Sequence, residues 1–273
     1  MSDTAATVDV RWLSAHPGVR IVDSRWSATG GSGRASYAKS HIPGAVFVDL
    51  DEDLSRRGGP GRHPFPSEKE FAGTLSRLGV FPDTHVVVYD DAGGAIAARL
   101  WFMLRVHGHG RASVLDGGFK AWLEAGLPVT QEVPRVEPAP LRQLRLDKSR
   151  LADRAQVEKR GKSVLLDARA PERYRGETEP LDPRAGHIPG ALNAPYQKNL
   201  ETDGRFRAPG DLYNLYKRYG DDVICSCGSG VTACHDVLAR EIAGLPPARL
   251  YVGSWSDWCS DPSRPIATGP EPG

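Results

Sequence analysis

The 273-residue sequence lacks the features that would assign it to a membrane, to secretion or to a polyanionic partner. No apolar run approaches the roughly 18–20 residues of a membrane-spanning helix, so we expect no membrane protein. The segment MSDTAATVDV has neither a basic region nor an apolar core, which indicates no secretion signal and favours a cytoplasmic location. With 35 basic and 34 acidic residues the net charge is +1, and no global field selects nucleic acid.

Cysteine is scarce, and its four copies lie in the last quarter of the chain: Cys225, Cys227, Cys234 and Cys259. In a reducing compartment such a cluster suggests a reactive thiol or a metal before a disulfide framework. The Cys-Ser-Cys spacing is not the usual spacing of a zinc site, and no paired histidine motif follows. We therefore expect no metal and no cofactor.

The sequence does contain an internal repeat. Ile-Val-Asp-Ser-Arg at 21–25 recurs as Leu-Leu-Asp-Ala-Arg at 165–169, and His-Ile-Pro-Gly-Ala at 41–45 recurs at 187–191. Three prolines between 133 and 140 indicate an extended linker between the copies. We expect an N-terminal domain over 6–130, a linker over 131–146 and a C-terminal domain over 147–269.

Each copy alternates short β-branched runs with helical patterns. Residues 86–89 indicate a strand with a helix through 97–106 after it, and residues 223–225 indicate a strand with a helix from 231 to 243. This alternation predicts an α/β protein of two tandem domains, each a mostly parallel sheet flanked by helices. Reactive loops of this architecture lie at the carboxyl ends of the strands.

One such loop, Cys-Gly-Ser-Gly-Val-Thr at 227–232, carries the chemistry. Gly228 and Gly230 let successive N–H groups point inward, and the following helix adds the positive end of its dipole. Sulfur at Cys227 would lie in an anion cradle that favours a thiolate or persulfide anion. The alternative interpretation is a small buried hydrophobe beside an ordinary turn. In the first copy, an offset of 136 places Asp91 at the position of Cys227, so that copy is expected to have no nucleophile.

Three features together point to a known family: His-Ile-Pro-Gly-Ala in both copies, the cysteine loop in the second copy alone, and Gly-Ser-Trp-Ser-Asp-Trp after that loop. With these features the sequence resembles the tandem rhodanese family. The loop is most similar to the 3-mercaptopyruvate sulfurtransferase branch, since thiosulfate-preferring members typically carry Cys-Arg-Lys-Gly-Val-Thr. The resemblance implies a sulfurtransferase with a persulfide on Cys227. It also implies a proton relay of Ser229, His63 and Asp51.

For the donor, the resemblance implies that Arg173 and Arg184 bind a carboxylate. A guanidinium binds a carboxylate through two parallel hydrogen bonds, although such arginines also form surface ion pairs with nearby acids. Because Gly228 and Ser229 bring no positive charge for thiosulfate, we expect 3-mercaptopyruvate as the donor and keep thiosulfate as the alternative. The expected acceptor is cyanide or a thiol such as thioredoxin. The expected donor-binding residues are Arg173, Arg184, Gly228, Gly230, Val231 and Thr232.

Two rival functions fit the sequence less well. A cysteine phosphatase or arsenate reductase needs an arginine six residues after its nucleophile, where Ala233 stands. A non-catalytic sulfur carrier or binding module is the more distant alternative; a binding module in which both copies are structural would be expected to lack Cys227, and Cys227 is present. His41 and His187 recur in both copies, so we expect them to be structural.

Overall fold

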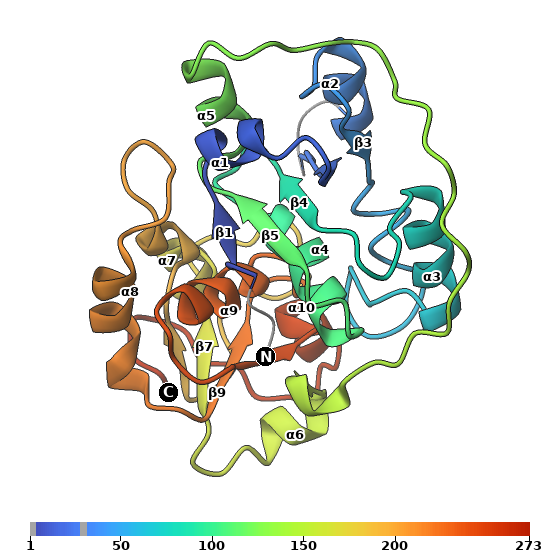
Figure 1. Ribbon diagram of the computed structural model, residues 1–273. Coiled ribbons are helices and arrows are strands. Elements are labelled where there is room, and N and C mark those ends of the chain that lie inside the picture. The colour runs from blue at the N-terminus through green and yellow to red at the C-terminus, as the bar shows by residue number, and fades with distance from the viewer. Residues whose placement is uncertain (1–3, 28–31) are drawn as a thin grey trace. The chain divides into compact units, whose positions relative to one another are not determined.

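The structure is a computed structural model that describes residues 4–27 and 32–273 (Figure 1). By internal contacts the chain divides into two compact units, and we describe each by itself. The division does not follow a single boundary, because residues 57–65 belong to the second unit. The first unit holds Met1–Arg56, Pro66–Asp147 and Thr202–Phe206, and the second holds Arg57–Phe65, Lys148–Glu201 and Arg207–Gly273.

The first unit is built on a five-stranded sheet of order β1-β5-β4-β2-β3 in which every pair is parallel. Its strands are β1 (Thr7–Val8), β2 (Arg20–Asp23), β3 (Val46–Phe47), β4 (Val86–Tyr89) and β5 (Ala112–Leu115). Its helices are α1 (Val10–Ala15), α2 (Gly33–Lys39), α3 (Glu68–Arg77), α4 (Ala97–Val106) and α5 (Gly118–Glu124).

The second unit has a five-stranded parallel sheet of order β6-β10-β9-β7-β8. Its strands are β6 (Leu151–Ala152), β7 (Val164–Asp167), β8 (Ala191–Asn193), β9 (Val223–Ser226) and β10 (Arg249–Tyr251). Its helices are α6 (Arg154–Glu158), α7 (Pro171–Tyr174), α8 (Pro209–Tyr216), α9 (Ala233–Ile242) and α10 (Ser254–Trp258), with 3-10 turns η1 (Lys148–Arg150), η2 (Tyr196–Asn199) and η3 (Lys217–Tyr219). The two orders correspond strand for strand, which confirms the predicted α/β class.

The central strands explain why the sheets lie inside. β4 and β9 are buried at every residue, as strands covered on both faces must be. Each is followed by a predicted helix: α4 covers 97–106 as expected, and α9 covers 233–242, two residues later in its start than the expected 231–243. The carboxyl end of β9 therefore faces a loop held between a buried strand and a largely buried helix.

Both units stabilise their His-Ile-Pro-Gly-Ala segment in the same way. His41 Nδ1 lies 2.7 Å from the Tyr37 carbonyl oxygen, and the two rings stack with centroids 3.9 Å apart. His187 repeats this with Tyr174 at 2.8 Å and 3.8 Å. Both histidines are fully buried, in agreement with the structural role expected of them.

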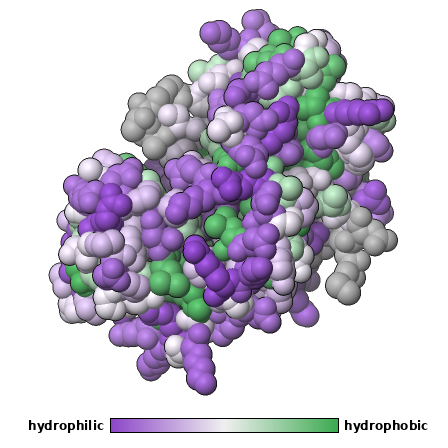
Figure 2. All heavy atoms as spheres, turned by 90° about the vertical axis from the view of Figure 1, so that its left-hand side faces the viewer, coloured by the Kyte–Doolittle hydropathy of each residue, from purple (hydrophilic) through white to green (hydrophobic). Residues whose placement is uncertain are grey.

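The face drawn in Figure 2 is largely hydrophilic, with hydrophobic side chains in smaller patches between. In the part of the chain that the structure describes, no helix is long and apolar enough to cross a membrane. Helices α3, α4 and α9 have 10 residues each, about half of a typical span.

Candidate active site

The loop after β9 places Cys227 at the carboxyl end of a central strand of the second sheet. Its Sγ accepts the N–H of Gly230 at 3.1 Å. Gly230 has a φ of +75°, and a Cβ there would lie 2.3 Å from the Val252 carbonyl oxygen. Only glycine fits this turn, and the turn directs a backbone donor at the sulfur.

Helix α10 supports the same loop from its N-terminal end. Ser254 Oγ accepts the N–H of Cys227 at 3.0 Å, and the N–H of Trp255 donates to the Cys227 carbonyl oxygen at 3.0 Å. The N–H of Ser256 donates to the Gly228 carbonyl oxygen at 2.9 Å. Ser254 has a φ of +52°, a strained value for a residue with a side chain. In the sequence, the motif Gly-Ser-Trp-Ser-Asp-Trp of this segment contributes to the family resemblance. Its hydrogen bonds to the cysteine loop could not be predicted, because they depend on the fold.

Burial disfavours the thiolate form of two of the other cysteines. Burial raises the pKa of the Cys225 thiol well above its ordinary value. Burial likewise raises the pKa of Cys259 to about 11. Both therefore remain neutral thiols near pH 7, and the thiolate is the reactive form. Cys234 lies in α9 with its Sγ 3.4 Å from the Gly230 carbonyl oxygen.

Two residues of the predicted relay lie in contact. His63 Nδ1 is 2.7 Å from Ser229 Oγ, and the segment 57–65 that carries His63 belongs to the second unit. This segment approaches the start of α10 closely, since a Cβ at Gly61 would lie 2.5 Å from the Gly253 carbonyl oxygen. Asp51 lies in the first unit, where its Oδ2 accepts the indole N–H of Trp26 at 2.7 Å, and its part in the relay stays a prediction.

The two predicted arginines have different surroundings. Arg173 lies against the loop, because a Cβ at Gly228 would be 3.5 Å from both of its terminal nitrogens. Arg184 Nη1 donates to the carbonyl oxygens of Asp261 and Arg264 at 3.3 Å and 3.1 Å. The role of either residue in donor binding stays a prediction, as do those of Val231 and Thr232, which complete the loop before α9.

Arg62 and Arg169 add positive charge near the loop, and of the two only Arg62 was missed by sequence reasoning. A Cβ at Gly228 would lie 3.0 Å from Arg62 Nη2, and Arg62 Nη1 pairs with Asp182. Arg169 is buried; although burial lowers its pKa, the charges of Asp167, Glu179 and Cys227 raise the pKa of Arg169 above its ordinary value. Nothing but its position next to His63 could have pointed to Arg62 in the sequence.

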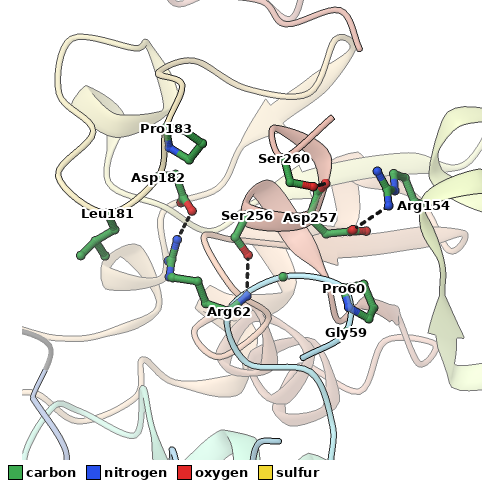
Figure 3. A pocket seen from close by; sticks show the side chains of 11 residues that line it. Gly59, Pro60, Arg62, Arg154, Leu181, Asp182, Pro183, Ser256, Asp257 and Ser260 are labelled. Carbon is green, nitrogen blue, oxygen red and sulfur yellow. Dashed lines mark hydrogen bonds and ion pairs between the residues drawn. The ribbon is translucent and has the colours of Figure 1, made fainter. Parts of the chain in front are cut away.

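An open pocket of about 540 Å³ adjoins this region. Figure 3 shows Arg62 at its wall, with the side chain directed at Asp182 and the backbone N–H at Ser256. Arg154 and Asp257 form a second ion pair in the same wall, with 3.1 Å between nitrogen and oxygen. The pocket gives the Arg62 side chain access to solvent.

The corresponding loop of the first unit corrects one prediction. The register of the strands pairs Asp23 with Tyr89 and Asp167 with Ser226, so Tyr89 and Ser226 are equivalent positions. The next residue in the first unit is Asp90. Asp90, rather than Asp91, is therefore equivalent to Cys227. The assignment of Asp91 is wrong because the loop 90–96 has seven residues and the loop 227–232 has six. The offset of 136 therefore holds for the helices that follow but not for the strands before the loops.

Asp90 shows what this loop geometry binds. Its carboxylate accepts four backbone N–H groups, each at 2.8 Å, from Ala92, Gly94, Ile96 and Ala97. A ring of N–H donors of this kind is a built anion site. The first unit therefore keeps an anion-binding loop but fills it with its own carboxylate.

Comparison with known protein families matches the rhodanese-like domain twice, over residues 8–125 and 151–261. The chain belongs to the rhodanese family. This tandem rhodanese is 45% identical over 270 residues to a probable 3-mercaptopyruvate sulfurtransferase of Pseudomonas aeruginosa, covering 93% of this chain and 94% of that one. It is 42% identical over 268 residues to a putative thiosulfate sulfurtransferase of Mycobacterium tuberculosis, covering 94% and 93%.

Solved structures of sulfurtransferases have the same fold as this chain. The 3-mercaptopyruvate sulfurtransferase of Leishmania major superposes with a TM-score of 0.85 at 30% identity, covering 95% of this chain and 76% of that one. The 3-mercaptopyruvate sulfotransferase of Escherichia coli gives 0.82 at 32% identity, covering 93% and 100%. This rhodanese is therefore a sulfurtransferase, while its relatives differ in the donor that their names state.

Proposed function

We propose that this rhodanese transfers sulfane sulfur from 3-mercaptopyruvate to a thiol or cyanide through a persulfide on Cys227. The observation that carries the proposal is the loop itself, in which Cys227 Sγ accepts a backbone N–H at 3.1 Å beside the contact of Ser229 with His63. A backbone donor aimed at sulfur stabilises negative charge there, both on the thiolate and on the persulfide that follows.

In the first half-reaction the Cys227 thiolate attacks the sulfur of mercaptopyruvate. The new S–S bond forms as the donor's C–S bond breaks, and the electron pair of that bond passes to carbon and gives the enolate of pyruvate. The donor thiol supplies the proton that this enolate takes up. The Ser229–His63 pair, in contact at 2.7 Å, needs only to relay that proton, with Asp51 as the proposed third member of the relay. Pyruvate leaves, and Cys227 holds the persulfide.

In the second half-reaction the acceptor attacks the outer sulfur of the persulfide. The S–S bond breaks, its electron pair returns to Cys227 as the thiolate, and the acceptor leaves as a persulfide or, from cyanide, as thiocyanate. We propose a thiol such as that of thioredoxin as one acceptor, in a reducing compartment such as the cytoplasm.

Donor choice depends on the charges beside the loop. Arg173 borders Gly228, which suits the carboxylate of mercaptopyruvate, and the resemblance adds Arg184. Thiosulfate is the second candidate, supported by the name of the relative at 42% identity. Steady-state kinetics with both donors decide between them: the proposal expects a higher kcat/KM for mercaptopyruvate, and a clear preference for thiosulfate would contradict it.

The sulfur carrier is tested by mass. Incubation with donor alone should add one sulfur to the peptide that contains Cys227, because the thiolate is both acceptor and carrier. Cys227→Ser should abolish the addition and the turnover, whereas Cys259→Ser, the matched control at a second buried cysteine, should keep both. Sulfur found on Cys225, Cys234 or Cys259 in the wild-type protein would contradict the assignment.

A further inference from the structure

A carboxylate is buried in the helix that follows the cysteine loop. Asp236 lies in the first turn of α9, which begins at Ala233 directly after the loop 227–232, and its side chain is fully buried. Burying an ionised carboxylate without a positive partner is costly, so such a group tends to keep its proton. Arg240 follows four residues later in α9, but its Nη2 donates to the Gly220 carbonyl oxygen at 3.0 Å.

One amide side chain holds this carboxylate and its neighbours in place. Asn199 Nδ2 donates to Asp236 Oδ1 at 2.9 Å and to His235 Nδ1 at 3.1 Å. Asn199 Oδ1 accepts the Tyr216 hydroxyl at 2.8 Å, and the ring of His235, which accepts at Nδ1, is the neutral tautomer. Asp236 Oδ2 has no hydrogen-bond partner among the described residues, so this oxygen is the free position for a proton.

The titratable and charged groups around Asp236 come from α9 itself and from the elements packed against it. Burial raises the pKa of the Asp236 carboxyl to about 7, although the hydrogen bond from Asn199 and the charge of Arg240 act against this shift. Burial also raises the pKa of the neighbouring tyrosine and of the neighbouring cysteine well above their usual values, so both are neutral near pH 7. The surrounding groups are Tyr216 of α8, Cys225 of β9, Asp167 of β7, His235 and Arg240 of α9, and Arg249 of β10, which pairs with Asp222 at 2.8 Å.

A small cavity lies between this network and the surface. Asn199 and Tyr216 line a cavity of about 10 Å³, which is room for about one water molecule. Lys198 and Arg218, both exposed, line the same cavity. The buried network is thus one cavity away from solvent, which gives the Asp236 proton a short path to the surface.

We propose that Asp236 is a proton-binding residue that makes the reactivity of Cys227 depend on pH. With its proton bound, Asp236 is neutral, and the N-terminal end of α9 stabilises negative charge on the Cys227 sulfur without opposition. When the proton leaves to solvent, the carboxylate places a negative charge in the first turn of α9 and opposes a second one on Cys227. By reciprocity, negative charge on Cys227 helps Asp236 to keep its proton. This inference deepens the proposed function and rests on Cys227 as its nucleophile.

The first test follows alkylation of Cys227 by neutral iodoacetamide, in which the thiolate forms a bond to carbon and iodide leaves. Measured on the peptide that contains Cys227, the rates of the wild type and Asp236→Asn should be nearly equal at pH 6, where both side chains are mostly uncharged. At pH 8.5 the variant should react faster, on the order of tenfold, the effect of one unit charge about 10 Å away at an intermediate dielectric constant.

Asp211→Asn is the matched control for this test, because it removes an exposed carboxylate from the first turn of α8. Its alkylation rate should follow that of the wild type at both pH values. A ratio of Asp236→Asn to wild type that is the same at pH 6 and pH 8.5, or an equal change in Asp211→Asn, would overturn the proposal.

The second test asks whether Asp236 binds its proton in the folded protein. A carboxyl whose pKa is raised by folding stabilises the fold at low pH, and that stability is lost as the pH rises to about 7. In urea unfolding from pH 5 to pH 7, the folding equilibrium constant of the wild type should fall about tenfold per pH unit relative to Asp236→Asn. Above pH 8 the two profiles should run parallel, and parallel profiles over the whole range would contradict the assignment.

A third measurement needs no variant. Carbon-13 NMR of wild-type protein labelled at its aspartate carboxyls should show a carboxyl that titrates near pH 7. Capping Cys227 with iodoacetamide removes its negative charge and should move this titration to lower pH, because the coupling acts in both directions. A titration that does not move would overturn the proposal. If the wild type forms no persulfide from either donor, the proposed function fails, and the alkylation and NMR results still decide whether Asp236 acts on Cys227.

Discussion

Replacing Gly230 with alanine perturbs the sulfur-binding loop at a position where both conformation and space require glycine. At a φ of +75° an alanine costs about 1–2 kcal/mol through contact of its Cβ with its own backbone. The Cβ would also lie 2.3 Å from the Val252 carbonyl oxygen, a backbone atom, and such overpacking typically costs about 1–3 kcal/mol more. We expect Gly230→Ala to lower the free energy of unfolding by about 2–5 kcal/mol.

The same change should reduce activity, because relief of the clash moves the Gly230 N–H away from Cys227 Sγ. A hydrogen bond to a charged group contributes about 1.5–3 kcal/mol, which corresponds to a loss of roughly 10- to 150-fold in the rate of persulfide formation. The assays are urea unfolding and single-turnover release of pyruvate.

Gly244→Ala is the matched control for this prediction. Gly244 follows α9 at a φ of +70°, and a Cβ there would meet nothing within 4 Å. We therefore expect Gly244→Ala to lower the free energy of unfolding only by the conformational cost, with no clash and no loss of activity. Equal destabilisation by the two variants, with turnover unchanged in Gly230→Ala, would refute the reasoning.

Two further predictions follow from other contacts. His63→Ala and Ser229→Ala should each lower mercaptopyruvate turnover by roughly 100-fold or more, and the double variant should be no worse than the poorer single one, as groups that act as one relay require; additive losses in a double-mutant cycle would contradict a shared relay. Asp90→Asn should destabilise the protein by about 2–4 kcal/mol, because an amide NH₂ would face two of the four loop N–H donors, whereas Asp91→Asn should change stability little. The reverse order in urea unfolding would contradict the assignment of Asp90 as the carboxylate that the loop N–H groups bind.

The sequence predicts local structure and repeated motifs well and contacts between distant segments poorly. The helix over 97–106 and the strand over 86–89 follow from patterns within a few residues of each other, and the structure confirms both. Arg62 could not be identified, because its position beside Gly228 depends on the path of residues 57–65 and on Asp182, 120 residues further along. The assignment of Asp91 failed for a similar reason, since a constant offset does not detect one extra loop residue.

The loops of the two units also explain how a duplicated domain keeps its fold after losing its chemistry. In the first unit the turn binds the Asp90 carboxylate through four N–H groups, so the bound anion belongs to the loop itself. In the second unit the equivalent residue is Cys227, whose Sγ accepts the N–H of Gly230 at 3.1 Å, and two arginines lie beside Gly228, the next residue. The Asp90 carboxylate thus engages four backbone donors of its loop, whereas Cys227 Sγ accepts one loop N–H and lies one residue from two guanidinium groups. The difference between a structural and a reactive rhodanese loop in this protein is therefore how many anion-binding groups the loop's own side chain leaves unused.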